Sequence, residues 1–272
     1  MCDTCGCNIT SGNKHLIEAG GKHQHTPSGK EAVTVLHSLL HENDHQASHN
    51  REHFDKNHVL AINIMSSPGS GKTTLLEATI NQLKSDFNIA VIEGDLETEN
   101  DAERIRKQGV TAIQIATGSA CHLDAHMVHD AVHTLNLNEL DIVFIENVGN
   151  LVCPASFDLG HHQNVTLLSV TEGDDKPQKY PVMFRGTDLM IISKSDFLDF
   201  IDDFDPAKAE HHLRHLANDA PVFTLSAKNQ KGFNHWIDWI KQQHQKLLYN
   251  IQHGASLHPS IQNDGQHLHT HE

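Results

Sequence analysis

A glycine-rich turn between a short apolar run and a helical pattern constrains the fold of this chain more than any other stretch. Residues 66–74 read Ser-Ser-Pro-Gly-Ser-Gly-Lys-Thr-Thr. The preceding residues, 59–65, are almost all apolar, and apolar residues recur at helical spacing from Leu75 to Leu83. A buried strand, a glycine-rich turn and a helix in this order predict a phosphate-binding loop.

The residue types in this turn suit the binding of a nucleotide. Gly69 and Gly71 let backbone N–H groups approach phosphate oxygens at a helix N-terminus, whose partial positive charge favours anions. Lys72 would reach the β- and γ-phosphates, and the Thr73 hydroxyl would bind Mg²⁺. Ser66 stands where such loops usually have their first glycine. The predicted nucleotide-binding residues here are Gly69, Ser70, Gly71, Lys72, Thr73 and Thr74.

Further stretches have the composition of buried strands, and segments with helical spacing separate them. They are residues 88–93, 111–116, 141–146, 165–170, 188–193 and 221–225. About seven strands alternating with helices predict an α/β fold of the P-loop GTPase type, with a mostly parallel sheet and helices on both faces. We assign residues 59–250 to this domain. We expect residues 1–58 to be a disordered, Cys- and His-rich metal-binding extension, and residues 251–272 a polar tail with histidines.

Charge and composition exclude several classes of partner. The 272 residues carry a formal net charge of -15, which disfavours nucleic acids and anionic membranes, because both bind basic surfaces. The sequence has no apolar stretch of membrane-spanning length and no signal-peptide pattern at its N-terminus, so we expect a cytoplasmic protein. Its 25 histidines indicate metal binding, because neutral imidazole is a common ligand.

Three of the five cysteines, Cys2, Cys5 and Cys7, crowd the N-terminus. An odd number of crowded cysteines does not suit a disulfide framework, and in a reducing compartment such residues read as metal ligands. With the terminal amine they could bind Ni²⁺ in square-planar geometry or Zn²⁺ in tetrahedral geometry. The alternative is a disordered, reduced tail that binds no metal.

Residues 8–58 are polar and offer little to bury, which predicts a mobile linker. Every fourth residue in part of it is a histidine, so that a helix would place the imidazoles on one face. These residues are His37, His41, His45, His49 and His53. One hypothesis is a metal-staging ladder that gains helicity when loaded; the other is a solvated His-rich linker.

Carboxylates end two of the predicted strands on the side where the phosphate loop should lie. Asp95 and Glu146 occupy these positions, and either could bind Mg²⁺ or its water shell. Gly149 follows Glu146 by three residues, as in a switch element whose acid polarises a Mg²⁺-bound water and whose glycine N–H senses the γ-phosphate. An ordinary strand-end acid is the alternative for Asp95.

Cys153 lies four residues beyond Gly149, so the predicted switch shares a loop with a candidate metal ligand. Cys121 and His122 stand at the expected start of a helix that runs to about Leu135. Two thiolates and one imidazole suit Zn²⁺ or Ni²⁺, with a fourth position left for water or a second subunit. His126, His129 and His133 form a stripe on the same helix, and we expect them to be merely exposed positions.

Two short elements near the C-terminal strands suit a guanine base. Lys194 and Asp196 resemble part of an Asn-Lys-x-Asp signature in which Ser193 replaces the asparagine, and the carboxylate could accept hydrogen bonds from guanine N1–H and the 2-amino group. Residues 226–228 resemble a Ser-Ala-Lys element that contacts guanine through its backbone. The predicted base-binding residues are Lys194, Asp196, Ser226, Ala227 and Lys228.

These motifs together resemble the hydrogenase nickel-incorporation GTPases called HypB. The resemblance rests on the Cys-x-x-Cys-Gly-Cys start, the phosphate loop, Cys121-His122, the segment from Glu146 to Pro154 and the segment from Thr171 to Pro177. It implies GTP hydrolysis to GDP, with Mg²⁺, during Ni²⁺ delivery to the large subunit of [NiFe]-hydrogenase. It also implies a zinc-containing HypA partner and a homodimer linked to nucleotide, with the metal site of the GTPase domain at its interface.

A switch mechanism follows from these assignments. GTP and Mg²⁺ would order residues 146–149, which would move Cys153 relative to Cys121 and His122 and change metal affinity or dimer contacts. The alternative function is a His-rich nickel or zinc storage protein with an ancillary GTPase domain.

Overall fold

The computed structural model describes residues 30–95, 99–118 and 120–259, with side chains from Leu40 onward. Its strands are β1 (Leu60–Ser66), β2 (Ile89–Asp95), β3 (Thr111–Ala116), β4 (Ile142–Glu146), β5 (Gln163–Ser169), β6 (Leu189–Ser193) and β7 (Val222–Thr224). Its helices are α2 (Lys30–Lys56), α3 (Lys72–Leu83), α4 (Asn100–Arg106), α5 (Ala125–Val132), α6 (Lys176–Lys179), α7 (Pro181–Arg185), α8 (Pro206–Arg214) and α9 (Phe233–Gln252). Short 3₁₀ helices span Leu137–Glu139, Cys153–Ser156, Val170–Glu172 and Ser195–Phe200.

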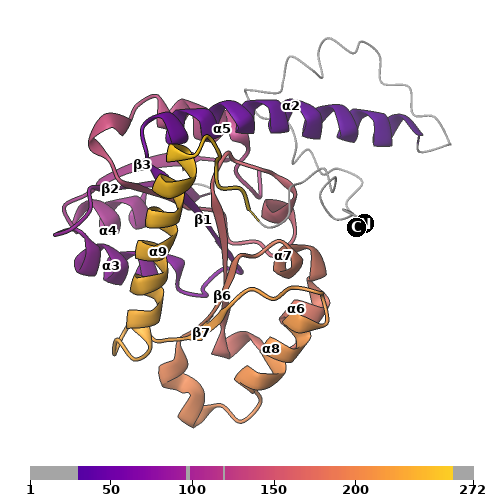
Figure 1. Cartoon of the computed structure of the whole chain (residues 1–272). Coiled ribbons are helices and arrows are strands. Elements are labelled where there is room, and N and C mark those ends of the chain that lie inside the picture. The colour runs from indigo at the N-terminus through magenta and orange to yellow at the C-terminus, as the bar shows by residue number, and fades with distance from the viewer. Residues whose placement is uncertain (1–29, 96–98, 119, 260–272) are drawn as a thin grey trace.

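The strands form one seven-stranded sheet in the order β3-β2-β4-β1-β5-β6-β7, and every neighbouring pair is parallel. Figure 1 shows helices on both sides of this sheet. The predicted α/β fold is therefore confirmed. Because β1 lies between β4 and β5, the loops that follow these three strands meet at one edge of the sheet, where the site is built.

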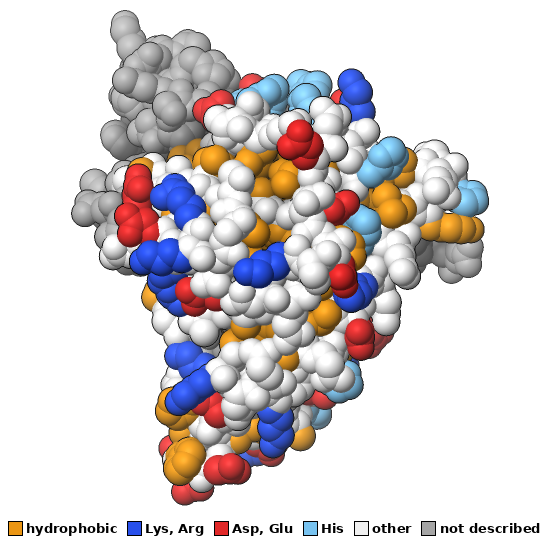
Figure 2. Space-filling view, turned by 90° about the vertical axis from the view of Figure 1, so that its left-hand side faces the viewer, with side chains coloured by type: hydrophobic (Ala, Val, Ile, Leu, Met, Phe, Trp, Pro, Cys, Tyr) orange, Lys and Arg blue, Asp and Glu red, His pale blue; other side chains and the backbone are white. Residues whose placement is uncertain are grey.

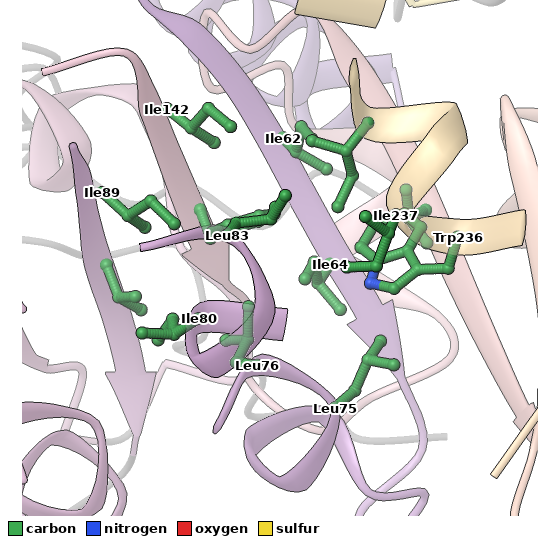
Figure 3. Close-up of a cluster of buried hydrophobic side chains, with 14 of the residues drawn as sticks. Ile62, Ile64, Leu75, Leu76, Ile80, Leu83, Ile89, Ile142, Trp236 and Ile237 are labelled. Atoms are coloured by element: carbon green, nitrogen blue, oxygen red, sulfur yellow. The ribbon is translucent and has the colours of Figure 1, made fainter. Parts of the chain in front are cut away.

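Alternate residues of the central strand face opposite sides of the sheet, as the pleat requires. Leu60, Ile62 and Ile64 of β1 belong to the core cluster beneath α3, α4 and α9. Figure 3 shows Ile62 and Ile64 among side chains of α3 and the Trp236 ring of α9. The Trp236 indole N–H donates to Thr79 Oγ1 at 2.8 Å, so this large side chain is buried with its polar atom satisfied.

The opposite face of the sheet packs against α2 and α5, with α7 and α8 further along the sheet. Val59 and Ala61 contribute from the β1 side, together with Val128 and Val132 of α5. Phe54 near the end of α2 is completely buried in this cluster. The helix α2 is thus part of the packed domain at its C-terminal end.

The prediction of a mobile linker over residues 8–58 is wrong for its described side-chain positions. Asn43, Ala47, Asn50, Arg51 and Phe54 form a buried helical stripe that docks α2 on the domain. The polar members of the stripe bond to the domain, and so a segment that is poor in apolar residues can still be buried. The domain therefore includes residues before 59, whereas residues 1–29 and their expected disorder lie outside the described residues.

Buried hydrogen bonds explain this docking. Asn43 Nδ2 donates to the Asp158 carbonyl at 2.8 Å, and Asn43 Oδ1 accepts from the backbone N–H of Ala125 at 2.9 Å. The Arg51 guanidinium pairs with the Asp158 carboxylate at 2.8 Å, and both side chains are largely buried. Gly160 makes the close approach possible, because a Cβ there would lie 2.5 Å from the Ala47 carbonyl oxygen.

The start of α5 and the C-terminal end of the domain differ from the predictions. The helix predicted to start at Cys121 begins at Ala125, because Asp124 caps it by accepting from the Met127 N–H at 2.8 Å. The predicted polar tail begins with residues that still belong to the domain, since α9 continues to Gln252 and Leu257 joins the core.

Acidic and basic side chains are interspersed on the face of the molecule that Figure 2 presents. Among the described helices, none combines the length and the apolar character needed to cross a membrane.

Candidate functional site

The phosphate loop runs from the end of β1 into α3 in the conformation that the sequence predicts. Gly69 and Gly71 both have positive φ angles, 76° and 97°. Lys72 is buried, and its Nζ donates to Ser66 Oγ at 3.1 Å, so the serine in place of the first glycine anchors the lysine. The loop borders a pocket of about 460 Å³.

Carboxylates line the far side of this pocket. Thr73 Oγ1 donates to Glu146 Oε1 at 2.8 Å, which leaves Glu146 Oε2 buried without a hydrogen-bond partner. Glu93 lies opposite Glu146 in the β2–β4 register, and its Oε2 is also buried and unpartnered. Asp95 ends β2 and borders the same pocket.

Burial disfavours the ionised form of Glu93 and Glu146. Burial raises the pKa of Glu93 to about 8, and the carboxylate of Glu146 adds to this shift. Burial also raises the pKa of Glu146 to about 7, although the ammonium of Lys72 opposes the shift. Unpaired carboxylate oxygens beside a threonine hydroxyl form a donor set that fits a hard divalent cation.

Sequence reasoning missed Glu93. It placed an acid only at the end of each strand, although Glu93 precedes Asp95 by two residues and therefore faces the same side of β2. It also gave no role to Glu172, whose Oε1 accepts from Ser70 Oγ at 2.5 Å and so ties the phosphate loop to the 3₁₀ helix that follows β5. A pair of strands with acids in register would have been the signal for Glu93.

The predicted switch segment lies against the phosphate loop. A Cβ on Gly149 would stand 2.9 Å from Pro68 Cα, so only glycine allows this separation between the two backbones. Asn147 and Asn150 connect the same segment to the residues before α5. Asn147 Oδ1 accepts from Leu123 N at 3.2 Å, and Asn150 Nδ2 donates to the Cys121 carbonyl at 3.2 Å.

The predicted base-binding residues border a second pocket of about 180 Å³, which shares Gly71, Thr74 and Lys194 with the first. Ser226 Oγ donates to Asp196 Oδ1 at 2.7 Å and holds this carboxylate in place. Lys194 has a left-handed backbone, and its Nζ donates to the Gly69 carbonyl at 2.6 Å. Ala227 and Lys228 complete the predicted set at the same pocket.

Ser193 has a structural role at this junction. Its Oγ donates to the backbone carbonyl of Ser70 at 2.8 Å and is buried. The short hydroxyl therefore ties β6 to the phosphate loop. The Asp196 carboxylate borders the second pocket, and its contact with a base stays a prediction.

Cys121, His122 and Cys153 come together as the sequence predicts. The two sulfur atoms lie 3.1 Å apart, and Cys121 Sγ lies 3.8 Å from His122 Nδ1. All three candidate ligand atoms fall within 4.8 Å of one another. His122 is buried and stacks on Phe157, and burial lowers its pKa, which favours the neutral imidazole that binds metals.

The histidines of the predicted ladder on α2 do not all have the same environment. His41, His45 and His49 are exposed on α2, with the rings of His45 and His49 4.8 Å apart, whereas His53 is half-buried against α5. The described residues show no three-ligand cluster made by the exposed members. The side chain of His37 and the residues Cys2, Cys5 and Cys7 lie outside the described residues.

The histidines of α5 differ from the expectation of merely exposed positions. His129 is half-buried and contacts Asn50 of α2, and His126 is half-buried with an unpartnered Nε2. His133 is exposed, as expected, but bonds to His129.

A family model described as CobW/HypB/UreG, nucleotide-binding domain, matches residues 60–224. The hydrogenase maturation factor HypB of Escherichia coli (strain K12) is 46% identical over 223 residues, which cover 82% of this chain and 77% of that protein. The chain belongs to the HypB family. The resemblance stated from the motifs is therefore confirmed.

Other HypB proteins give the same result. A hydrogenase/urease maturation factor HypB of Helicobacter pylori (strain ATCC 700392 / 26695) is 43% identical over 225 residues, covering 81% of this chain and 92% of that protein. The crystal structure of H. pylori HypB in complex with nickel superposes with a TM-score of 0.72 at 44% identity, covering 75% of this chain and 96% of that one. HypB from Archaeoglobus fulgidus superposes with a TM-score of 0.71 at 38% identity, covering 75% of this chain and 100% of that one.

Proposed function

We propose that this chain is a GTP-hydrolysing nickel metallochaperone that helps to insert nickel into the large subunit of [NiFe]-hydrogenase. The names of its relatives, hydrogenase maturation factors, support this role, as does the nickel complex of H. pylori HypB. The observation that carries the proposal is the connection between the nucleotide pocket and the Cys121-His122-Cys153 cluster. One segment, residues 146–153, contributes to both.

The first pocket holds the phosphates and the second holds the guanine base. Lys72 and the backbone N–H groups of the loop bind the β- and γ-phosphates of GTP. Thr73, Glu146, Glu93 and Asp95 would hold Mg²⁺, directly or through water. Mg²⁺ would neutralise phosphate charge and suit the buried, unpartnered carboxylate oxygens of Glu93 and Glu146. Asp196, fixed by Ser226, accepts from guanine, and the Lys194 stem covers the base.

The nickel ion is cargo in this scheme. The thiolates of Cys121 and Cys153 and the neutral imidazole of His122 bind Ni²⁺ or Zn²⁺, and a second copy of the chain or water fills the fourth position. The N-terminal Cys2, Cys5 and Cys7 form a second nickel site, and a HypA-like zinc-containing nickel chaperone is the partner protein. We place this work in the cytoplasm, with a homodimer linked to nucleotide and metal and without nucleic-acid or membrane partners.

Two hydrogen bonds transmit the switch in this scheme. When the Gly149 N–H bonds to the γ-phosphate, Asn147 and Asn150 on either side of it shift as well. Because Asn147 bonds to Leu123 N and Asn150 bonds to the Cys121 carbonyl, both flanks of the metal cluster respond. Nucleotide and metal affinities must then change reciprocally.

The test is a Ni²⁺ and Zn²⁺ titration of the protein without nucleotide, with GDP and with a GTP analogue. Oligomer mass and GTP hydrolysis are measured in parallel for wild type, Lys72→Ala and Cys153→Ala. We expect Lys72→Ala to lose hydrolysis and Cys153→Ala to lose the nucleotide-dependent shift in metal affinity or mass. Metal binding that ignores nucleotide and resides in the His-rich segments would support the storage function instead.

A further inference from the structure

Three imidazoles from two helices meet on the side of the domain opposite α3 and α9. His53 comes from α2, His129 from α5, and His133 is the residue that caps the C-terminus of α5. Their candidate ligand atoms lie within 4.8 Å of one another, and His129 Nε2 is 3.0 Å from His133 Nε2. The ring of His53 lies 5.9 Å from that of His129 and 5.3 Å from that of His133.

Asn50 determines which nitrogen of His129 carries the proton. Asn50 Nδ2 donates to the carbonyls of Ala125 and Leu159 at 2.8 and 3.1 Å, so the orientation of the amide is fixed. Its Oδ1 therefore faces His129 Nδ1 at 2.9 Å, and an oxygen there requires an N–H on the imidazole. In the neutral ring the lone pair must then be on Nε2, the atom that faces His133.

This arrangement is typical of a metal-binding histidine, whose other ring nitrogen donates to a fixed oxygen. Two nitrogens bound to one tetrahedral metal ion at about 2.05 Å each would lie about 3.3 Å apart. The observed 3.0 Å between His129 and His133 is close to this separation. His53 and His133 are half-buried and exposed, respectively, so their side chains can adjust around the more constrained His129.

We propose that His53, His129 and His133 form a metal site, separate from the Cys121-His122-Cys153 cluster, for a borderline divalent ion such as Ni²⁺ or Zn²⁺. Imidazole suits these ions. The set contains no carboxylate, which disfavours Mg²⁺ and Ca²⁺, and no thiolate, which disfavours Cu⁺. Water completes the coordination shell on the exposed side.

The site would link α2 to the domain, because its ligands come from both helices. It lies at the docked end of the helix that also carries the exposed His41, His45 and His49. A bound ion would therefore hold α2 against α5 and slow its local opening, by the linkage that makes any ligand of the docked state stabilise that state. This consequence does not depend on GTP hydrolysis.

The experiment uses the full chain with Cys121→Ser and Cys153→Ala, so that the Cys121-His122-Cys153 cluster cannot bind Ni²⁺. Ni²⁺ alone is the probe, supplied at buffered free concentrations in equilibrium dialysis. Hydrogen exchange of residues 40–58 is measured with and without Ni²⁺. His53→Gln and His133→Gln remove one ligand each, and His49→Gln removes an exposed histidine one turn away on α2 as the matched control.

We expect the first two variants to lose one tight Ni²⁺ equivalent, with an affinity at least about tenfold weaker. They should also lose the Ni²⁺-dependent slowing of exchange in α2, whereas His49→Gln should keep both properties. Far-UV circular dichroism checks that each variant is folded. Equal Ni²⁺ binding and equal slowing in His133→Gln and the parent would refute the site, as would a loss in His49→Gln as large as that in His133→Gln.

Discussion

The buried His161 should make the stability of this domain depend on pH. His161 is 2% exposed, and it follows Gly160, where α2 packs against the loop before β5. Burial lowers its pKa from 6.5 to about 4; the carboxylate of Asp158 opposes this shift, and the guanidinium of Arg51 adds to it. Its Nδ1 also accepts a 3.4 Å hydrogen bond from Leu159 N, which a proton on that atom would remove.

The lowered pKa of His161 determines whether the free energy of unfolding rises or falls with pH. Below about pH 6.5 the unfolded chain protonates this histidine while the folded chain does not, so the free energy of unfolding falls as the pH falls toward 4. A full shift of this size corresponds to about 3 kcal/mol, and about 2 kcal/mol of it should be lost between about pH 7 and pH 5. Glu93 and Glu146 act in the opposite direction, because their raised pKa values make the folded state bind protons first.

The contribution of His161 is therefore measured as a difference between variants. Urea unfolding of wild type and His161→Gln at several pH values gives two curves, and the groups they share cancel when one is subtracted from the other. We expect the difference in unfolding free energy between wild type and His161→Gln to change by about 2 kcal/mol from about pH 7 to pH 5. A constant difference for His161→Gln would show that burial does not keep this imidazole neutral.

Three further predictions test other parts of the structure. Asp158→Asn leaves the Arg51 guanidinium buried without its charge partner, so the free energy of unfolding in urea should fall by about 3 kcal/mol, whereas the exposed Asp202→Asn should have little effect. Gly149→Ala places a methyl group 2.9 Å from Pro68 Cα and should weaken fluorescent GTP-analogue binding at least about tenfold; Gly186→Ala, whose Cβ has ordinary contacts, should bind normally, and normal binding by Gly149→Ala would disprove the close approach. Asp196→Ala should weaken the binding of GTP roughly 30-fold, about 2 kcal/mol, without changing the weaker binding of ATP. Equal losses of affinity for both nucleotides would mean that Asp196 does not recognise the base.

The sheet and the nucleotide pocket were predictable because their signals are local. Each strand is a short apolar run, and the phosphate loop needs no residue from elsewhere to be recognised. Glu146 could be assigned because it ends a strand, and parallel strands bring their carboxyl ends together. Glu93 was missed because its importance comes from facing Glu146 across the β2–β4 register, which a single strand does not reveal.

The docking of α2 could not be predicted from hydrophobicity. Its buried face contains two asparagines and an arginine. Residues of these types in a polar segment predict a solvated linker. They are buried because each finds a partner far away in sequence: Asn43 and Asn50 bond to backbone near α5, and Arg51 pairs with Asp158. Partners that lie 75 to 107 residues apart leave no periodic signal.

Helical spacing in the sequence predicts only part of the cluster of His53, His129 and His133. His129 and His133 are four residues apart, so a helix alone brings them together. By itself that pair predicts at most a weak, exposed chelate. The third ligand and the orienting Asn50 come from α2, and they reach the pair only because the polar face of α2 is buried. The same hydrogen bonds that invalidate the linker interpretation therefore fix the tautomer of His129, so the docking of α2 and the ability of this cluster to bind metal are one structural property.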